Sequence, residues 1–420
     1  MTYNFIFGEC AELCSEKVDP QFFRDSPYIG LEHIEQQTLS ISGSGWGVDV
    51  NSQKQKFKKG DILFGKLRPY FRKVVIAPFD GICSTDIWVV RPKPGIDRNF
   101  VFYWMASEEF VSSSTFASEG GRMPRAKWDW VSRFRLPYLP LKQQQVIGKT
   151  LRILDEKIET NKQLSKTLED IAQTIFKSWF IDFDPVKAKM AGEKPVGMDD
   201  ATAALFPDSM EDSELGMIPV GWSWGTTGDL FDIVGGGTPS TGTIEFWNGD
   251  IYWTTPKDLS IQNGLITTKS ARLVTLAGLA KISSGLLGRH SVLMSCRAPI
   301  GYLSVTAVPT ATNQGIIAIL ENEKYSPLFL VNWLLASMSE IENRAGGATF
   351  AEISKKAFRD IPFLECGALL NEEFNLIASP ILLQLESLTE QTDSLIALRD
   401  GLLPRLISGE LKIPEEMLVT

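Results

Sequence analysis

The chain has 420 residues, of which 44% are hydrophobic and 22% charged, with a formal net charge of −9. This composition is typical of a folded protein and excludes a disordered chain, because enough apolar surface is present to offset the ordering entropy. No apolar run approaches the roughly 20 residues of a membrane helix, and the first residues lack the features of a signal peptide, so we expect no membrane association and a cytoplasmic location.

Residues 1–140 are expected to form a globular domain built from short strands. Runs of β-branched and aromatic residues, such as 74–76 and 87–90, alternate with turn residues, which is typical of strands. A helical patch at 100–109, a Gly-Gly loop at 120–121 and a short strand at 136–137 follow. Between Lys54 and Lys73, eight basic residues stand against one acid, so this stretch could face phosphate groups.

Residues 141–184 are expected to form one long helix. Apolar positions recur with an unbroken 4-3-4-3 spacing from Ile147 to Ile175, which is the spacing of a coiled-coil seam. The seam contains Ile147, Leu151, Leu154, Ile158, Asn161 and Leu168.

The stretch 185–218 is rich in Gly, Pro and acids and is predicted to be a linker. Residues 219–366 then repeat the first domain, with strand-like runs, a helical patch at 328–340, a Gly-Gly loop at 346–347 and a short strand at 361–362. A second long helix is expected over 367–412, followed by a tail at 413–420. Pro380 predicts a kink or a separate segment near the start of this helix.

The two halves are related by a spacing of 230 residues. Pro69 and Pro299 are separated by this distance, as are Leu168 and Leu398. The same shift gives the second seam as Ile377, Ile381, Leu388, Gln391, Leu395, Leu398 and Leu402. Asn161 and Gln391 then share one seam position, where polar residues can fix the register. We expect the two helices to pair antiparallel; the alternative is that each packs only on its own domain.

The residue types that most catalytic sites require are scarce. Only His33 and His290 occur, which argues against a His-based metal site or nucleophile triad, so both are expected to be surface or structural residues. The Gly-rich stretches 43–47 and 235–239 lack the context of a phosphate-binding loop. We find no Walker A motif, no Asn-Pro-Pro-aromatic tetrapeptide and no nuclease-like acid pair. The five cysteines form no CxxC pair and are expected to be reduced packing residues.

Three segments carry a resemblance to a known family. They are 175–186 (IFKSWFIDFDPV), 398–411 (LRDGLLPRLISGEL), and 236–240 (GGTPS) followed by 246–253 (FWNGDIYW). In this order the chain resembles the DNA-specificity subunit of type I restriction-modification enzymes. The first half departs from the pattern, because no Gly-Gly-Thr-Pro follows residues 9–13.

The resemblance implies an α+β fold, in which two globular α/β target recognition domains are separated by two long helices. These helices would form an antiparallel coiled coil with an internal pseudo-twofold repeat. Each domain would read one half of a split, asymmetric site on double-stranded DNA. The seam from Ile147 to Ile175 would span about 43 Å, and one turn of B-DNA is roughly 34 to 36 Å, so the seam could place two readers about one turn apart.

The resemblance also implies that the chain has no activity and binds no cofactor or metal by itself. It would dock two modification subunits, which use S-adenosylmethionine to methylate adenine, and restriction subunits with motor and nuclease activity, which use ATP and Mg²⁺. The alternatives are a stand-alone DNA methyltransferase or nuclease with a degenerate motif, and a coiled-coil adaptor that binds only proteins.

The candidate DNA contacts are basic residues and amides near turns, because phosphates position a protein on DNA and base edges specify the sequence. In the first domain they are Lys66, Arg68, Arg72, Lys73, Arg122, Arg125 and Lys127. In the second domain they are Lys257, Arg297, Asn313, Gln314, Thr349, Lys355 and Lys356. Solvated surface charge or a purely structural turn is the alternative interpretation of each. The more basic first domain is expected to supply more of the salt-dependent affinity, so reversing the charges of Arg68 and Arg72 should weaken binding.

Overall fold

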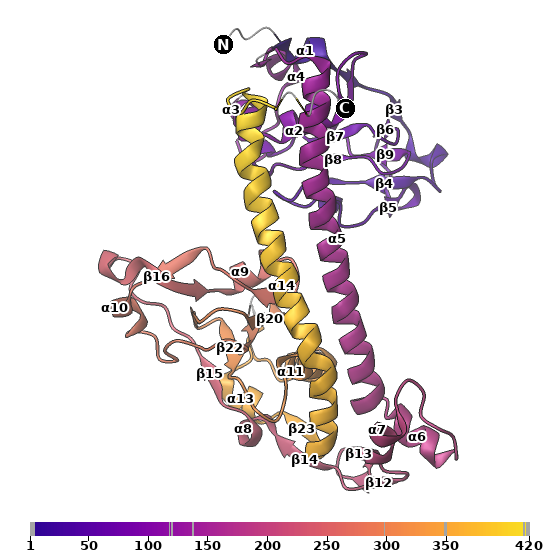
Figure 1. Ribbon diagram of the computed structural model, residues 1–420, viewed down its shortest axis with the longest axis vertical. Helices are drawn as coiled ribbons and strands as arrows, with labels where there is room; N and C mark the ends of the chain where they lie inside the picture. Colours follow the sequence, from indigo (N-terminus) through magenta and orange to yellow (C-terminus); the bar gives the residue numbers. More distant parts are fainter. Residues whose placement is uncertain are drawn as a thin grey trace. The chain divides into compact units, whose positions relative to one another are not determined.

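The computed structural model describes residues 5–416 except 117, 119–120, 137, 298, 348–350 and 415. The chain divides into two compact units: unit 1 comprises Met1–Ile158 and Ser394–Thr420, and unit 2 comprises Glu159–Asp393. Two long helices, α5 (Leu141–Phe180) and α14 (Ala368–Ile407), contribute residues to both units (Figure 1).

Unit 1 contains a four-stranded and a five-stranded sheet besides a two-stranded pair. The first has the strand order β2-β10-β7-β8 and is antiparallel, and the second has the order β3-β6-β9-β4-β5 with β4 and β9 parallel. Helix α2 (Arg98–Ala106) contributes a buried run from Phe100 to Ala106 to the core of the first sheet, and Asp97 caps it by accepting from the Phe100 amide. The strands are β2 (Ala11–Cys14), β10 (Ile87–Pro92), β7 (Ile62–Gly65), β8 (Val74–Ile76), β3 (Lys17–Val18), β6 (Lys54–Phe57), β9 (Gly81–Cys83), β4 (Pro27–Ile29) and β5 (Gly45–Trp46).

Unit 2 also contains a larger sheet and a smaller one. The larger has the order β15-β22-β19-β20-β17, and the smaller has the order β18-β16-β21 with β16 and β21 parallel. Helix α11 (Pro327–Ala336) is buried along most of its length and is capped by Ser326. The strands are β15 (Ile233–Gly235), β22 (Ile316–Ile319), β19 (Val292–Cys296), β20 (Ile300–Thr306), β17 (Ile266–Thr267), β18 (Arg272–Val274), β16 (Trp247–Thr254) and β21 (Thr310–Thr312).

Shorter elements complete each unit. In unit 1 they are β1 (Phe5–Ile6), α1 (Phe7–Cys10), the 3₁₀ turns η1 (Pro20–Phe22), η2 (Leu31–His33), η3 (Gly47–Asp49) and η4 (Pro69–Phe71), α3 (Glu108–Phe116), α4 (Trp128–Val131) and β11 (Arg135–Leu136). In unit 2 they include β14 (Ser223–Thr226), α8 (Thr227–Leu230), η5 (Ile244–Phe246), α9 (Pro256–Ile261), α10 (Leu276–Leu279), α12 (Met338–Asn343), α13 (Lys355–Arg359) and β23 (Pro362–Glu365).

The two units repeat one topology. In each, a central antiparallel trio (β10-β7-β8 and β22-β19-β20) is followed by a capped helix (α2 and α11). Each also contains a parallel pair, β4 with β9 and β16 with β21, and unit 2 has a second one, β17 with β20. The internal repeat expected from the sequence is therefore confirmed.

The stretch 185–218, predicted as a linker, contains regular structure. Helices α6 (Asp184–Met190) and α7 (Asp200–Leu205) are followed by a hairpin of β12 (Met210–Ser213) and β13 (Gly216–Pro219). Val186 and Phe206 are buried, and the Phe206 ring lies 5.3 Å from the Trp179 ring of α5. The connection between the repeats is thus packed against the end of α5.

Helices α5 and α14 run antiparallel within each unit. In unit 1, Ile147 and Leu151 of α5 share a core with Leu403 and Leu406 of α14, while Asp155 further along α5 pairs with the earlier Arg399. In unit 2, the rings of Phe176 and Phe180 contact the ring of Phe374 near the start of α14. The antiparallel direction predicted from the seams is confirmed.

The predicted seam positions are buried or half-buried in α5, whereas the buried positions of α14 are displaced from the predicted ones. In α5, Ile147, Leu151, Ile158 and Asn161 are buried, and Leu154 and Leu168 are half-buried. In α14 the predicted positions are less well covered: Leu388 is buried, Ile377, Ile381, Leu395 and Leu402 are half-buried, and Gln391 and Leu398 are exposed. The buried positions of α14 are Leu370, Asn371, Phe374, Ala378, Leu382, Leu385, Glu386, Leu388, Arg399, Leu403, Leu406 and Ile407.

The displacement has a simple geometric cause. Both helices have 40 residues, and they begin at Leu141 and Ala368, which are 227 residues apart. The sequence spacing of 230 differs by three residues, which is close to one helical turn, so an apolar pattern survives the error. With the correct spacing, Asn161 corresponds to Leu388, so the expected pair of polar seam residues does not exist.

Pro380 does not interrupt α14, contrary to the sequence prediction. The helix is continuous from Ala368 to Ile407. Pro380 and Leu376, one turn earlier, are both exposed. The Leu376 carbonyl, which Pro380 cannot bond, therefore lies on a face that water can reach. Among the described residues, no helix has the length and apolar character to cross a membrane.

Replacing Asn161 by Leu is expected to raise the free energy of unfolding. Asn161 is 1% exposed, and neither its amide nitrogen nor its amide oxygen has a hydrogen-bond partner. An unpaired buried amide costs about 1–3 kcal/mol, and the repeat places a buried Leu388 at the equivalent position. Urea denaturation of the full chain measures the change, with Gln391→Leu as the exposed control. An unchanged or lower stability of Asn161→Leu would contradict the expectation.

Candidate nucleic-acid interface

A strained basic turn connects β7 and β8 in unit 1. This reading turn, residues 66–72, contains η4 and places Arg68 and Arg72 in the left-handed region, with φ of 50° and 49°. Bulky residues rarely adopt this conformation unless tertiary contacts hold it. The Arg68 amide donates to the Pro124 carbonyl, and its Nη2 donates to the Arg122 carbonyl at 3.1 Å.

The loop 121–127 lies against the reading turn. Leu67 and Arg125 form an antiparallel bridge, and the Ala126 amide donates to the Lys66 carbonyl at 2.9 Å. The Arg125 guanidinium donates two hydrogen bonds to the Asp86 carboxylate, from Nε to Oδ1 at 2.8 Å and from Nη2 to Oδ2 at 3.1 Å. The fold thus brings together basic groups from distant parts of the sequence.

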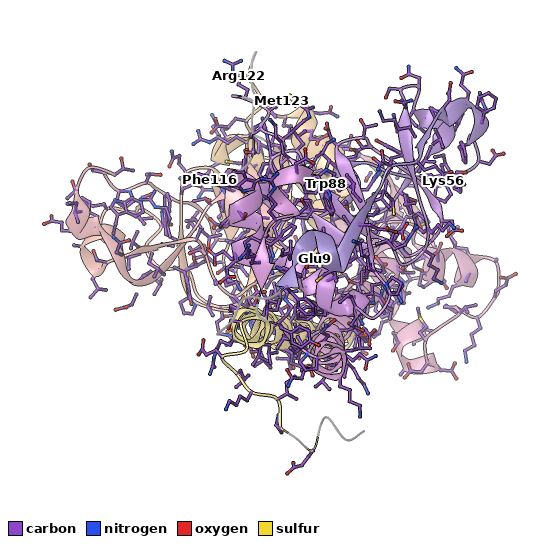
Figure 2. All side chains as sticks on the ribbon, turned by 90° about the horizontal axis from the view of Figure 1, so that it is seen from above. Glu9, Lys56, Trp88, Phe116, Arg122 and Met123 are labelled. Atoms are coloured by element: carbon purple, nitrogen blue, oxygen red, sulfur yellow. The ribbon has the colours of Figure 1, made fainter. Side chains whose placement is uncertain are left out.

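We call this assembly the first basic surface, comprising Lys66, Arg68, Arg122, Arg125 and Lys127. Arg122, Arg125 and Lys127 are exposed. Figure 2 shows Arg122 and Met123 projecting at the periphery, whereas Trp88 lies in the interior. Exposed rings accompany the charges, at Tyr70 in the turn, Phe116 at the end of α3 and Trp130 in α4. Cationic and aromatic side chains together suit a polyanion that carries flat bases.

Arg72 and Lys73 turn away from this surface. The Arg72 side chain is 15% exposed, and its Nη2 lies 3.6 Å from Oδ1 of Asp400. The Lys73 ammonium donates to the Leu31 carbonyl at 2.5 Å. Burial lowers the pKa of both side chains, an effect that Asp400 opposes for Arg72. Both side chains are half-buried and engaged in contacts within the domain.

The corresponding surface of unit 2 carries a different charge. Arg297, 230 residues after Leu67, forms a bridge with Glu352, and its Nη1 lies 3.7 Å from the Glu352 carboxylate. Glu352 occupies the place of Arg125 in the bridge, so this position is acidic in unit 2 and basic in unit 1. Lys355 and Lys356 begin α13 and are exposed. Thr349 lies outside the described residues.

Asn313 is a turn-forming residue. Its Oδ1 accepts from the Gly315 amide at 3.0 Å, as the Ser84 hydroxyl accepts from the Asp86 amide at 3.2 Å in unit 1. The two turns also make the same backbone contact, since Asp86 and Gly315 accept from the amides of Lys66 and Cys296. This shared geometry supports the structural alternative for Asn313.

Gln314, by contrast, is exposed and held in one orientation. The Thr238 hydroxyl donates to its Oε1 at 2.5 Å. Thr238 belongs to the Gly-Gly-Thr-Pro loop, whose Gly237 amide donates to the Thr312 carbonyl. A Cβ on Gly236 would lie 2.0 Å from the same carbonyl oxygen, so only glycine permits this approach. Lys257 in α9 is exposed.

Arg272 is a basic residue of unit 2 that the sequence interpretation missed. Its guanidinium carbon lies 3.5 Å from the ring centroid of Trp247 and 5.2 Å from that of Trp253. The two indole nitrogens donate to the Ser240 and Gly237 carbonyls, so the same rings also hold the Gly-Gly-Thr-Pro loop. The sequence signal for this contact is the pair of tryptophans in one strand, because a cationic side chain can lie over an indole ring.

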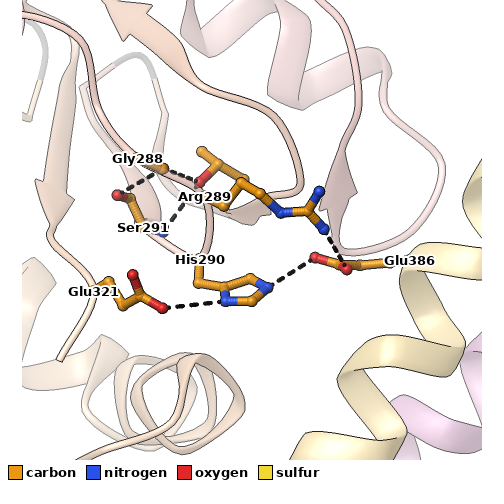
Figure 3. Close-up of polar contacts among 7 residues, drawn as sticks. Gly288, Arg289, His290, Ser291, Glu321 and Glu386 are labelled. Carbon is orange, nitrogen blue, oxygen red and sulfur yellow. Dashed lines mark hydrogen bonds and ion pairs between the residues drawn. The ribbon is translucent and has the colours of Figure 1, made fainter. Parts of the chain in front are cut away.

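Glu386 of α14 anchors a turn of unit 2 (Figure 3). The buried carboxylate accepts from Nη2 of Arg289 at 2.9 Å and contacts Nε2 of His290 at 3.1 Å. Nδ1 of His290 lies 3.3 Å from Glu321. His33 is likewise engaged, since its Nδ1 accepts from the Gly30 amide at 2.9 Å. Both histidines have structural contacts, as expected.

The cysteines are placed as packing residues. Burial raises the pKa of Cys10 to about 11 and the pKa of Cys83 and Cys366 to about 12, so these thiols stay protonated near neutral pH. Cys296 is buried and Cys14 half-buried. Within the described part of the chain, no group of three or more His, Cys, Asp or Glu side chains could hold a metal ion.

Comparison with known proteins identifies the repeat. Residues 13–170 and 219–363 each match the type I restriction modification DNA specificity domain. The chain is 28% identical over 405 residues to the type I restriction enzyme HindI specificity subunit of Haemophilus influenzae, covering 85% of this chain and 88% of that protein. It is 31% identical over 153 residues to the MjaIX specificity subunit of Methanocaldococcus jannaschii, covering 36% of this chain and 35% of that protein.

A solved structure shares the fold. The type I restriction-modification system S subunit from M. genitalium aligns with a TM-score of 0.54 at 14% identity, covering 97% of this chain and 96% of that one.

Proposed function

Because the chain belongs to the family of type I restriction-modification DNA specificity subunits, we propose that each unit reads one half of a bipartite, asymmetric DNA site. The observation that carries this proposal is the repeated bridge between a turn and a loop, Leu67 with Arg125 in unit 1 and Arg297 with Glu352 in unit 2. The two units thus present the same architecture with different side chains. Different side chains suit different base sequences.

Unit 1 supplies more of the salt-dependent affinity in this proposal. The first basic surface carries five Lys and Arg side chains against the carboxylate of Asp86, which pairs with Arg125. At the equivalent bridge, unit 2 balances Arg297 with Glu352. Phosphate contacts by cationic side chains release counterions, so binding through unit 1 responds more strongly to salt.

The helices offer the docking surface for modification subunits. Leu369, Leu376 and Leu383 of α14 are exposed and recur every seven residues, which places them on one face. On α5, Ile153, Leu164 and Ile171 are exposed at spacings that also fall on one face. Unpaired apolar stripes on a helix suit a stable protein partner. Two stripes fit two modification subunits.

The remaining functions belong to the partner subunits. The modification subunits bind S-adenosylmethionine and methylate adenine, and the restriction subunits bind ATP and Mg²⁺. This chain supplies the sequence recognition without a cofactor of its own, and the assembly acts in the cytoplasm.

Selection from a random DNA library tests the proposal. The full chain, assembled with its modification subunits, is expected to enrich two short conserved sequences separated by a spacer of fixed length. Methyl transfer or cleavage by the purified chain alone would favour the enzyme alternative. Absence of any sequence-specific complex, with or without modification subunits, would favour the protein adaptor.

Gln314→Ala is expected to relax the base preference at one position of the second half-site. Its exposed amide is held by Thr238 and can pair with a base edge, and a well-placed amide contributes about 1–3 kcal/mol of discrimination. Binding to a panel of single-base variants of the site measures the change. Gln391→Ala, an exposed amide on α14, is the control and should leave every position unchanged. Retention of all second-site preferences by Gln314→Ala would remove this residue from the interface.

A further inference from the structure

A buried ionic cluster in unit 1 joins α2, α5 and α14. The Arg399 side chain is 2% exposed, and its Nη1 lies 2.7 Å from Oδ1 of Asp155. Its Nη2 lies 3.0 Å from Oδ1 of Asp400. The Tyr103 hydroxyl donates to Oδ2 of Asp155 at 2.5 Å. Arg399 thus pairs with both carboxylates, the Tyr103 phenol bonds the Asp155 carboxylate, and Asp400 stays partly exposed.

Arg72 attaches the reading turn to this cluster. Its guanidinium is largely buried and contacts the same Oδ1 of Asp400 that binds Arg399. Arg68 directly precedes η4 and Arg72 directly follows it, and both residues have left-handed backbone angles. Such residues cost on the order of 1 kcal/mol or more each and persist only where surrounding contacts hold them. The contact with Asp400 holds the side chain at the end of the turn, and Gln37 holds its backbone by donating to the Tyr70 and Phe71 carbonyls.

The cluster has no counterpart in unit 2. At the 227-residue spacing of the helices, Asp155 corresponds to Leu382 and Arg399 to Ala172, which both lie in the apolar core of unit 2. At the 230-residue spacing of the strands, Arg72 corresponds to Tyr302, which packs against apolar neighbours. In unit 2 the corresponding contacts between α5 and α14 are apolar, so helix pairing alone does not require the cluster.

We propose that Arg72 and Asp400 are positioning residues, which hold the reading turn, and through it Arg68 and Arg122, in the geometry that reads the first half-site. Neither residue contacts DNA. The inference rests on the proposed function and adds to it which side chains fix the reading geometry of unit 1. It also explains why a conspicuous arginine of the basic run is buried.

Asp400→Asn distinguishes this proposal from a purely electrostatic effect, because the two predict opposite changes in DNA affinity. Removal of a negative charge from a DNA-binding protein strengthens binding if electrostatics alone decides the outcome. A reading turn that is held less firmly lowers the affinity for the specific site instead. We expect Asp400→Asn to weaken specific binding roughly fivefold or more, which is the smallest loss that one misplaced base contact causes. The dependence on salt stays unchanged, because no phosphate contact is lost.

The experiment uses the full chain assembled with its modification subunits and a duplex that carries both selected half-sites. The dissociation constant is measured against salt for Asp400→Asn, Arg72→Met and the double variant. Both single variants should lose affinity with an unchanged salt slope. The double variant should be no weaker than the weaker single one, because both act through one contact. Asp129→Asn, an exposed acid in α4, is the matched control and should not weaken binding.

Base preferences in the second half-site provide the internal control for folding, and we expect all variants to retain them. A slope that falls by about 0.9 in Arg72→Met would overturn the proposal, because that is the effect of losing one phosphate contact. Binding by Asp400→Asn as tight as the original, or loss of both half-site preferences, would also overturn it. Failure of the proposed function itself is distinguishable, since the unaltered assembly would then show no sequence-specific binding.

Discussion

Arg399→Met is expected to lower the free energy of unfolding by about 3–5 kcal/mol, the typical cost of removing one partner from a buried ion pair. The substitution leaves Asp155 without its cation while the carboxylate remains largely buried beside Tyr103. Burial by itself would lower the pKa of Arg399, but Asp155 and Asp400 more than offset it and raise the pKa, so the side chain is charged at every pH at which the fold persists. Urea denaturation of the full chain measures the loss.

Two further variants identify the cause of that loss. Arg405→Met removes an exposed arginine of the same helix, whose Nε lies 3.3 Å from Glu410, and it should change stability by less than about 1 kcal/mol. The double variant Arg399→Ala and Asp155→Leu reproduces the Ala172 and Leu382 pair of unit 2 and should recover part of the loss, because it leaves no unpaired carboxylate at position 155. An Arg399→Met protein as stable as the Arg405→Met control would show that the cluster does not stabilise unit 1.

Arg122→Gln combined with Lys127→Gln is expected to weaken DNA binding roughly thirtyfold at about 0.15 M salt. Both residues belong to the first basic surface and are exposed, so the substitutions remove charge without disturbing the core. Each phosphate contact contributes about 0.9 to the slope of log affinity against log salt, so the slope should fall by about 1.8. The dissociation constant of the assembled enzyme, measured across a salt series, tests both numbers.

The matched control is Lys187→Gln combined with Lys194→Gln. These two lysines are exposed in and after α6, among acidic residues that do not suit contact with phosphate. The control should retain the original slope within the error of one contact. Equal slopes for the two double variants would remove the first basic surface from the interface. The pair Arg68 and Arg72 is less suitable for this test than the sequence indicates, because Arg72 is buried against Asp400 and its reversal would disturb the fold.

Local patterns in the sequence predicted the two long helices, the helical patches and several strands of this fold. Strands at 74–76 and 87–90, the paired helical patches and the two long helices follow from alternation, from turn residues and from the 4-3 spacing of apolar side chains. The repeat of the two halves was also visible, because identical turns need similar residues at similar distances. These features depend on neighbours within a few residues or on a constant offset.

The register of α14 is harder to predict from the sequence. A helix shifted by three residues keeps nearly the same apolar face, so a spacing of 230 imitates the true spacing of 227. The predicted kink at Pro380 is absent for a related reason. Whether a proline interrupts a helix depends on what can satisfy the freed carbonyl, and here that carbonyl lies on an exposed face.

Composition, spacing and motifs therefore predicted the class of protein, the two-domain repeat and the pool of basic residues from which a DNA interface could be built. Which of those residues form an open surface depends on contacts made in the folded chain. Arg72 and Arg122 are equally basic, but Asp400 from the far end of the chain buries one, and the loop 121–127 presents the other beside the reading turn. Charge is a property of a residue, whereas burial and pairing depend on side chains that meet only after the chain has folded.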